Sequence, residues 1–170
     1  MKQFDAEAYL ALVRTWSKKH NIIGGLDPCE LFSQAREALK NTPEIVDGSL
    51  VVDVGAGAGW MAMAWLSMST TGKAYCIEPD PKSSSFLFLA LSSLEGLNGR
   101  LFVDDRRFEG VPRETIARID PNFTLVSRAF SPADALLPLY EASDFRSDSL
   151  YLFFYNKLLP KGQRSRLKPI

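Results

Sequence analysis

The sequence is poor in the residues that build metal sites, disulfide frameworks and membrane spans. It has two cysteines, Cys29 and Cys76, and one histidine, His20. Without a Cys-x-x-Cys pair, these residues cannot form a zinc site or a set of disulfides, and we expect both thiols to be buried as small apolar groups. The longest apolar run, residues 60–66, has seven residues, whereas a membrane helix needs about 18.

An excess of charge of either sign is also missing. Twenty Lys and Arg residues balance twenty Asp and Glu residues, so an anionic partner would have to meet a local basic patch. One such patch follows Asp148, because the chain beyond it has no acidic residue and contains five basic ones: Lys157, Lys161, Arg164, Arg166 and Lys168. Near the N-terminus, Asp5 and Glu7 precede the first short apolar stretch, which disfavours an export signal and predicts a cytoplasmic protein with no membrane partner.

The length and composition are those of one globular unit with a small appendage. The chain has 170 residues, of which 46% are hydrophobic and 24% charged. Apolar residues recur at helical spacing over residues 5–20, and Asp27-Pro28 is typical of the start of a second helix that ends near Lys40. We therefore predict a helical segment over residues 1–45, an α/β domain over 46–156 and a basic tail over 157–170.

Short apolar runs alternate with helical patterns from residue 49 onward. Strands are expected over residues 50–54, 74–77, 100–103, 123–127 and 150–155, and helices over 60–67, 81–94 and 132–142. Strands that alternate with helices predict right-handed crossovers and a mostly parallel sheet with helices on both faces.

Glycines follow the first expected strand, in the segment Val52-Asp53-Val54-Gly55-Ala56-Gly57-Ala58-Gly59. Such a turn lets a ligand approach the backbone, and the helix after it offers free N–H groups at its start. The dinucleotide fingerprint needs a glycine where this chain has Trp60, and the Lys-Ser or Lys-Thr pair of a P-loop is missing. Both of those sites are disfavoured, and a tight strand–helix turn without a ligand is the structural alternative.

An acidic residue closes the next expected strand. Glu78 follows Asp53 by 25 residues, and Asp-x-Gly-x-Gly-x-Gly followed by such an acid resembles the first motif of class I S-adenosylmethionine (SAM) dependent methyltransferases. The resemblance implies a Rossmann-like domain that binds SAM, with Glu78 accepting hydrogen bonds from the ribose hydroxyls. The cofactor residues it implies are Asp53, Gly55, Ala56, Gly57, Gly59 and Glu78. The alternatives are a solvated charge for Glu78 and, for Asp53, a buried carboxylate that accepts backbone N–H bonds.

Four segments resemble a narrower family, the RsmG (GidB) methyltransferases of bacterial small-subunit rRNA. They are the glycine-containing segment and residues 16–23 (Trp-Ser-Lys-Lys-His-Asn-Ile-Ile), 78–87 (Glu-Pro-Asp-Pro-Lys-Ser-Ser-Ser-Phe-Leu) and 127–130 (Ser-Arg-Ala-Phe). The resemblance covers about residues 14–157 and implies methyl transfer from SAM to N7 of a guanine, with 16S rRNA or the 30S subunit as partner. Two other functions stay open: a non-catalytic relative that binds RNA or a protein, and a small-molecule methyltransferase.

The chain departs from the family pattern in several places. Where the family has a His-x-x-Asp-Ser segment, this chain has Gln34-Ala35-Arg36-Glu37-Ala38. Where the family has Phe-Pro-Gly after the glycines, this chain has Trp60-Met61-Ala62. The family has a Gly-Arg-Ala-Glu stretch after the third strand. Only Arg106 matches it in this chain, and the resemblance implies that Arg106 contacts the cofactor. The chain stops at Ile170, whereas the family continues into two more strands. We therefore expect a fold without the last two strands, in which the strand at 150–155 offers an apolar edge to a partner.

Arg128 is the candidate catalytic residue implied by the Ser-Arg-Ala-Phe segment. At the mouth of an open α/β sheet its guanidinium can hold a substrate phosphate or the target base; the alternative is an ion pair with Asp53 or Glu78. The N7 atom of guanine has a free lone pair at neutral pH, so the reaction needs alignment and no general base.

Other basic and aromatic side chains are candidates for contacts with RNA. The expected RNA-binding set is Lys18, Lys19, Lys82, Arg128 and Lys157, with solvated surface charges as the alternative. Trp16 and Trp60 can stack on a base, but Trp16 lies on the apolar helix face, which favours a place in the core.

Overall fold

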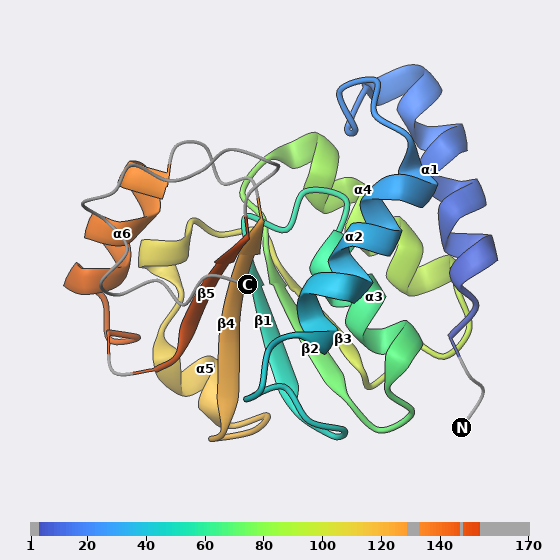
Figure 1. Ribbon diagram of the computed structural model, residues 1–170. Helices are drawn as coiled ribbons and strands as arrows, with labels where there is room; N and C mark the ends of the chain where they lie inside the picture. The colour runs from blue at the N-terminus through green and yellow to red at the C-terminus, as the bar shows by residue number, and fades with distance from the viewer. Residues whose placement is uncertain (1–3, 129–132, 147, 154–170) are drawn as a thin grey trace.

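The computed structural model describes residues 4–128, 133–146 and 148–153 of the chain. Its centre is a sheet of five strands: β1 (Leu50–Val54), β2 (Lys73–Ile77), β3 (Leu101–Asp104), β4 (Phe123–Arg128) and β5 (Leu150–Phe153). Neighbouring strands are all parallel, in the order β3-β2-β1-β4-β5. β1 is therefore central, and the residues that follow β1, β2 and β4 meet at one edge of the sheet (Figure 1).

Helices cover both faces of this sheet, as Figure 1 shows. One layer contains α1 (Ala6–His20), α2 (Pro28–Lys40), α3 (Trp60–Met68) and α4 (Pro81–Ser93), and the other contains α5 (Arg113–Ala117) and α6 (Ala133–Ala142). Side chains of β1 alternate between the layers, since Val51 packs in the first apolar cluster whereas Leu50 and Val52 pack in the second. The predicted parallel sheet with helices on both faces is confirmed.

Capping residues explain where the first two helices begin. The carboxylate of Asp5 accepts hydrogen bonds from the N–H groups of Glu7 and Ala8, and that of Asp27 serves α2 in the same way. The buried faces of α1 and α2 belong to the same apolar cluster as α3 and α4. The division into a helical segment, a SAM-binding domain and a tail stays a prediction, and the tail, with Lys157, lies outside the described residues.

Two features differ from the expectations above. The helix α5 and a 3-10 turn at Phe108–Gly110 were not predicted, because elements of five and three residues are too short to show a period. The prediction that both thiols are buried is wrong for Cys29, although it is confirmed for Cys76. Cys29 lies outside the buried face of α2 and accepts a hydrogen bond from the guanidinium of Arg14, with 2.8 Å between Nη2 and Sγ.

β5 forms an edge of the described sheet, next to β4. Residues 154–155 of the predicted strand lie outside the described residues, and a partner contact through this edge stays a prediction. Among the helices that the structure describes, none has the length and apolar character needed to span a membrane.

Candidate cofactor site

The segment that joins β1 to α3, residues 55–59, is called the glycine loop here. Its three glycines, Gly55, Gly57 and Gly59, have φ angles of 69°, 56° and 83°. The N–H groups of Gly55 and Ala56 both donate to the carbonyl oxygen of Ile77, at 2.9 and 3.2 Å. The glycine loop therefore turns against the end of β2, where Glu78 follows.

Glu78 faces the glycine loop with both carboxylate oxygens engaged. Its Oε2 accepts a hydrogen bond from Gly57 N at 2.6 Å, and its Oε1 accepts one from Asp80 N at 2.8 Å. The residue is only 7% exposed, so the alternative of a solvated strand-end charge is wrong. Each carboxylate oxygen has a second lone pair, which can accept from a ribose hydroxyl.

Gly57 and Gly59 are needed for different reasons. A side chain on Gly59 would be strained by the φ angle of 83°, and its Cβ atom would lie 2.8 Å from Cδ2 of Leu87 in α4. A Cβ atom on Gly57 would meet nothing within 4 Å. Gly57 therefore leaves open space beside the carboxylate of Glu78, and this is the space that an adenosyl group needs to approach the backbone. The residues present thus fit SAM.

Asp53 supplies the cap that α3 lacks. The N-cap residue of α3 is Gly59, which has no side chain, and the first turn has no acidic residue. The Oδ2 atom of Asp53 instead accepts a hydrogen bond from Ala62 N at 3.1 Å. Burial raises the pKa of Asp53 to about 7. The hydrogen bond from Ala62 N lowers this pKa, whereas the negative charge of Glu78 raises it. The interpretation of Asp53 as a buried carboxylate is confirmed, and its contact with the methionine end of SAM stays a prediction.

Two further side chains hold the glycine loop. The hydroxyl of Tyr9, in α1, donates to the carbonyl oxygen of Ala58 at 2.9 Å. The hydroxyl of Ser127 donates to the carbonyl oxygen of Val54 at 2.7 Å, one residue beyond the last backbone pair of β1 with β4. Neither role was predicted. In the sequence, the role of Tyr9 was indicated only by a hydroxyl on an apolar helix face. The role of Ser127 was indicated only by its place beside Arg128.

The two arginines of the predicted site lie against neighbouring protein groups. The guanidinium of Arg128 donates to the carbonyl oxygen of Leu31 and to Oε1 of Gln34, each at 2.6 Å, so α2 holds it at the edge of the sheet where the glycine loop lies. Arg106 forms a bidentate pair with Asp104 at the end of β3, at 2.9 and 2.6 Å. The contacts predicted for Arg128 with substrate and for Arg106 with the cofactor stay predictions.

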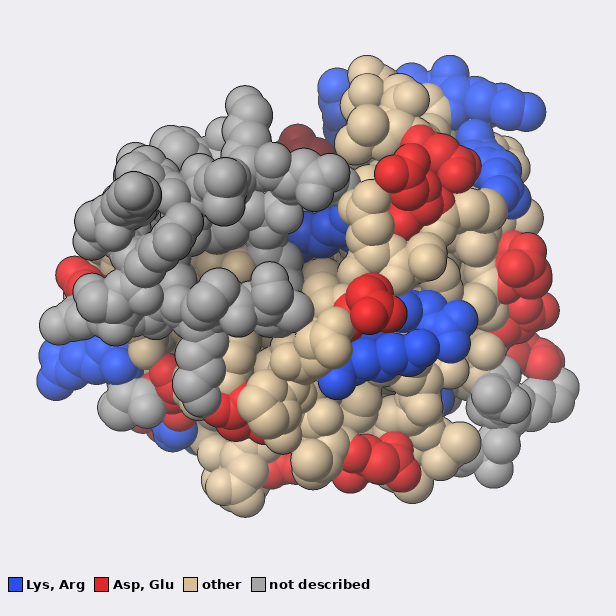
Figure 2. All heavy atoms as spheres, in the orientation of Figure 1, with Lys and Arg blue, Asp and Glu red and all other residues tan. Residues whose placement is uncertain are grey.

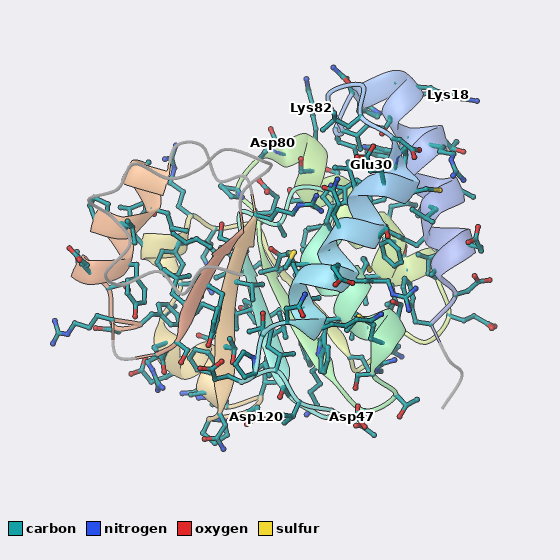
Figure 3. All side chains as sticks on the ribbon, viewed as in Figure 1. Lys18, Glu30, Asp47, Asp80, Lys82 and Asp120 are labelled. Carbon is teal, nitrogen blue, oxygen red and sulfur yellow. The ribbon has the colours of Figure 1, made fainter. Side chains whose placement is uncertain are left out.

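The described lysines of the predicted RNA-binding set are exposed at one end of the molecule. Lys18 and Lys19 are in the last turn of α1, and Lys82 is in the first turn of α4. Figure 3 shows Lys18 and Lys82 at the upper end of the view, whereas Asp47 and Asp120, which precede β1 and β4, lie at the opposite end. In Figure 2, basic side chains gather at that upper end over α1.

The two tryptophans considered for base stacking, Trp16 and Trp60, both pack against other aromatic rings. The ring of Trp60 lies edge-on to that of Tyr9, with centroids 5.9 Å apart, and is 9% exposed. The ring of Trp16 is half-buried between His20 and Phe86, at centroid distances of 4.4 and 6.1 Å. Trp16 packs against the first apolar cluster as a partly buried residue, which confirms its core interpretation in part.

Comparison with known proteins agrees with this geometry. The family model for rRNA small subunit methyltransferase G, GidB, matches residues 2–145. Curated relatives with the name ribosomal RNA small subunit methyltransferase G include one from Aliarcobacter butzleri, 28% identical over 91% of this chain and 75% of its own length. Another, from Helicobacter pylori strain 26695, is 27% identical over 86% of this chain and 78% of its own length.

Solved structures show the same fold at low identity. A candidate SAM-dependent methyltransferase from Methanococcus maripaludis superposes with a TM-score of 0.53 at 17% identity, over 91% of this chain and 65% of that one. A candidate RNA methyltransferase from Pyrococcus horikoshii gives a TM-score of 0.50 at 17% identity, over 89% and 73% of the two chains. With the family match over most of its length, the chain belongs to the rRNA small subunit methyltransferase G (GidB) family of SAM-dependent methyltransferases.

Proposed function

We propose that this enzyme transfers a methyl group from SAM to N7 of a guanine in 16S rRNA. The observation that carries the proposal is the carboxylate of Glu78, which accepts a hydrogen bond from Gly57 N at 2.6 Å beside the open space at Gly57, at the end of the central strands. The family match supports an rRNA substrate. An rRNA substrate also supports the predicted cytoplasmic location, because ribosomal subunits are assembled there.

The cofactor would be held by residues from three strands. Glu78 would accept hydrogen bonds from the ribose, Gly57 would admit the adenosyl group to the backbone, and the Asp53 side of the loop would face the methionine end. Arg106, at the end of β3, would border the same space. Bound SAM supplies a methyl group on a positively charged sulfur.

The chain needs to supply orientation more than proton transfer. The N7 lone pair of guanine is free at neutral pH, and alignment of the two reactants can itself contribute about 7–11 kcal/mol to the barrier reduction. Arg128 would contribute the positive charge that holds a phosphate or the target base, because the two bonds from its guanidinium to α2 fix it at this edge of the sheet.

The lysines support an rRNA substrate through their position. Lys18, Lys19 and Lys82 are exposed at the end of the molecule toward which the strands point, as Figure 3 shows for two of them. Phosphate contacts by such side chains would make binding fall with rising salt. Lys157, outside the described residues, is the remaining member of the set.

The test is transfer of tritium from labelled SAM into 30S subunits that lack the N7 modification. We expect label in the 16S rRNA at a single guanine, and none in subunits that already carry the modification. SAM binding without transfer to either subunit or naked rRNA would support the non-catalytic alternative. Transfer to a small molecule, with RNA binding that does not depend on salt, would support the third function and contradict the proposal.

A further inference from the structure

Tyr9 connects the N-terminal helix to the cofactor site. It lies in α1, outside the strand–loop–helix unit that carries the glycine loop, and its side chain is fully buried. Aromatic rings from three other helices surround it: Phe32 at 5.7 Å, Trp60 at 5.9 Å and Phe86 at 6.2 Å between centroids. These contacts fix the ring, so the hydroxyl can be aimed at a single acceptor, the carbonyl oxygen of Ala58.

The glycine loop needs such a contact because of its sequence. Ala58 lies between Gly57 and Gly59, and residues without a Cβ atom let the neighbouring peptide groups rotate at little cost. A turn bond within the loop, from Gly59 N to the carbonyl oxygen of Ala56 at 2.7 Å, holds the peptide group between Ala58 and Gly59, and two further bonds reach this part of the loop from other elements. Glu78 accepts from Gly57 N on the side of the open space, and Tyr9 donates to Ala58 O on the side of the core.

We propose that the Tyr9 hydroxyl is a positioning group for SAM, which holds the glycine loop in its binding-competent conformation through Ala58. This inference rests on the proposed cofactor site and assigns α1 a part in it. Because the hydroxyl is buried and bonded to Ala58, it would act through the loop and not by contact with the cofactor. It acts by excluding other orientations of the peptide groups between Gly57 and Gly59.

Removal of the hydroxyl tests this role while the ring packing is kept. In Tyr9→Phe the carbonyl oxygen of Ala58 loses its donor, so a smaller fraction of molecules has the loop conformation that binds SAM. The apparent Kd for SAM equals the intrinsic Kd divided by that fraction, and it therefore rises. We expect a Kd for SAM and for S-adenosylhomocysteine that is roughly five- to tenfold higher. In turnover the KM for SAM should rise by a similar factor, and kcat at saturating SAM should stay within about twofold.

Tyr140→Phe is the matched control. Tyr140 lies in α6, in the opposite layer, and its hydroxyl also bonds to backbone carbonyl oxygens, those of Asp148 at 2.6 Å and Arg146 at 3.0 Å. A merely structural role for Tyr9 predicts that both variants lower Tm and that neither changes the Kd. Absence of SAM binding by the wild type would contradict the cofactor site itself, whereas unchanged binding by a folded Tyr9→Phe variant would overturn only the role of Tyr9.

A second measurement uses the wild type and does not depend on the folding of a variant. Coupling between two sites is reciprocal, so if the Tyr9 bond favours SAM binding, bound cofactor must favour the Tyr9 bond. By NMR, saturation with S-adenosylhomocysteine should slow exchange of the Tyr9 hydroxyl proton by about the same five- to tenfold factor. An exchange rate that does not change on saturation would overturn the proposal.

Discussion

The two ends of α3 are built from the same kind of interaction and serve different purposes. At the N-terminal end, where the glycine loop enters, Asp53 of β1 accepts a hydrogen bond from Ala62 N. At the C-terminal end, the buried guanidinium of Arg100 donates to the carbonyl oxygens of Gly72, Leu66 and Ser69, at 2.9, 3.2 and 2.5 Å. In both cases a remote charged side chain satisfies backbone groups at an end of the helix, and Arg100 also bonds to Gly72 in the turn that follows.

The two ends differ in how strongly burial disfavours the ionised form of the side chain. Burial lowers the pKa of Arg100, but its guanidinium has three backbone acceptors. Burial raises the pKa of Asp53 to about 7, so its ionised form is disfavoured below neutral pH. The N-terminal end also has three glycines with positive φ. We infer that α3 is stabilised mainly at its C-terminal end and binds ligand at its N-terminal end. Variants at the two ends should therefore separate stability from binding.

Arg100→Met should give the largest effect. Three buried carbonyl oxygens lose their donor, which we expect to lower the free energy of unfolding by about 4 kcal/mol. Urea denaturation measures this, with the exposed Arg118→Met as control. Calorimetry on the folded variant in the cold should give a Kd for SAM within about twofold of the wild type. A large loss of affinity would show that the two ends are not separable.

Gly57→Val should act on binding. The side chain would occupy the open space beside Glu78, and we expect the Kd for SAM to rise at least about a hundredfold, close to 3 kcal/mol. Gly25→Val is the control, because Gly25 also has a positive φ, 79°, and open space around its Cβ position, but lies between α1 and α2. Both variants should lose similar stability through backbone strain. Equal affinities for SAM would contradict the assignment of the open space.

Asp53→Asn should reveal the cost of the buried charge through pH. In the unfolded chain the carboxyl titrates near 3.8 and in the folded chain near 7. Between these values the folded state binds the extra proton, so wild-type stability falls as pH rises toward 7 and is level above it. The variant lacks this titration. From pH 5 to pH 8 its stability relative to the wild type should rise by about 2–3 kcal/mol in urea titrations. A pH-independent difference would contradict the raised pKa.

Ser127→Ala should give the smallest effect. The Val54 carbonyl oxygen loses its hydroxyl donor just before the glycine loop, which should cost about 1 kcal/mol of stability. The exposed Ser149→Ala is the control and should leave Tm unchanged. If the two variants have the same Tm, Ser127 does not hold the end of β1.

Local pattern was enough to predict most elements, and together with the family resemblance it located the candidate site. Periodicity placed the helix over 5–20 and the strand over 50–54, because each buries one continuous apolar face or run. The glycine loop was predictable because it follows a strand end, and the resemblance to class I methyltransferases added Glu78, which parallel pairing of β1 with β2 brings to the same edge.

Contacts between distant segments were not predictable. Nothing in the spacing shows that Tyr9 reaches Ala58, that Arg100 reaches the end of α3, or that Arg128 bonds to Gln34. These contacts depend on how α1, α2 and the turn before β3 pack against the sheet. The same limit explains Cys29, whose exposure depends on which face of α2 is covered.

The central claim is that Glu78 and the glycine loop form the SAM site, and calorimetric titration with SAM tests it most directly. The wild type should bind one SAM. Glu78→Gln should bind at least about tenfold more weakly, because an amide NH2 would replace an oxygen that accepts from Gly57 or Asp80. Glu114→Gln, at an exposed position in α5, should match the wild type. No binding by the wild type, or equal binding by Glu78→Gln, would contradict the claim.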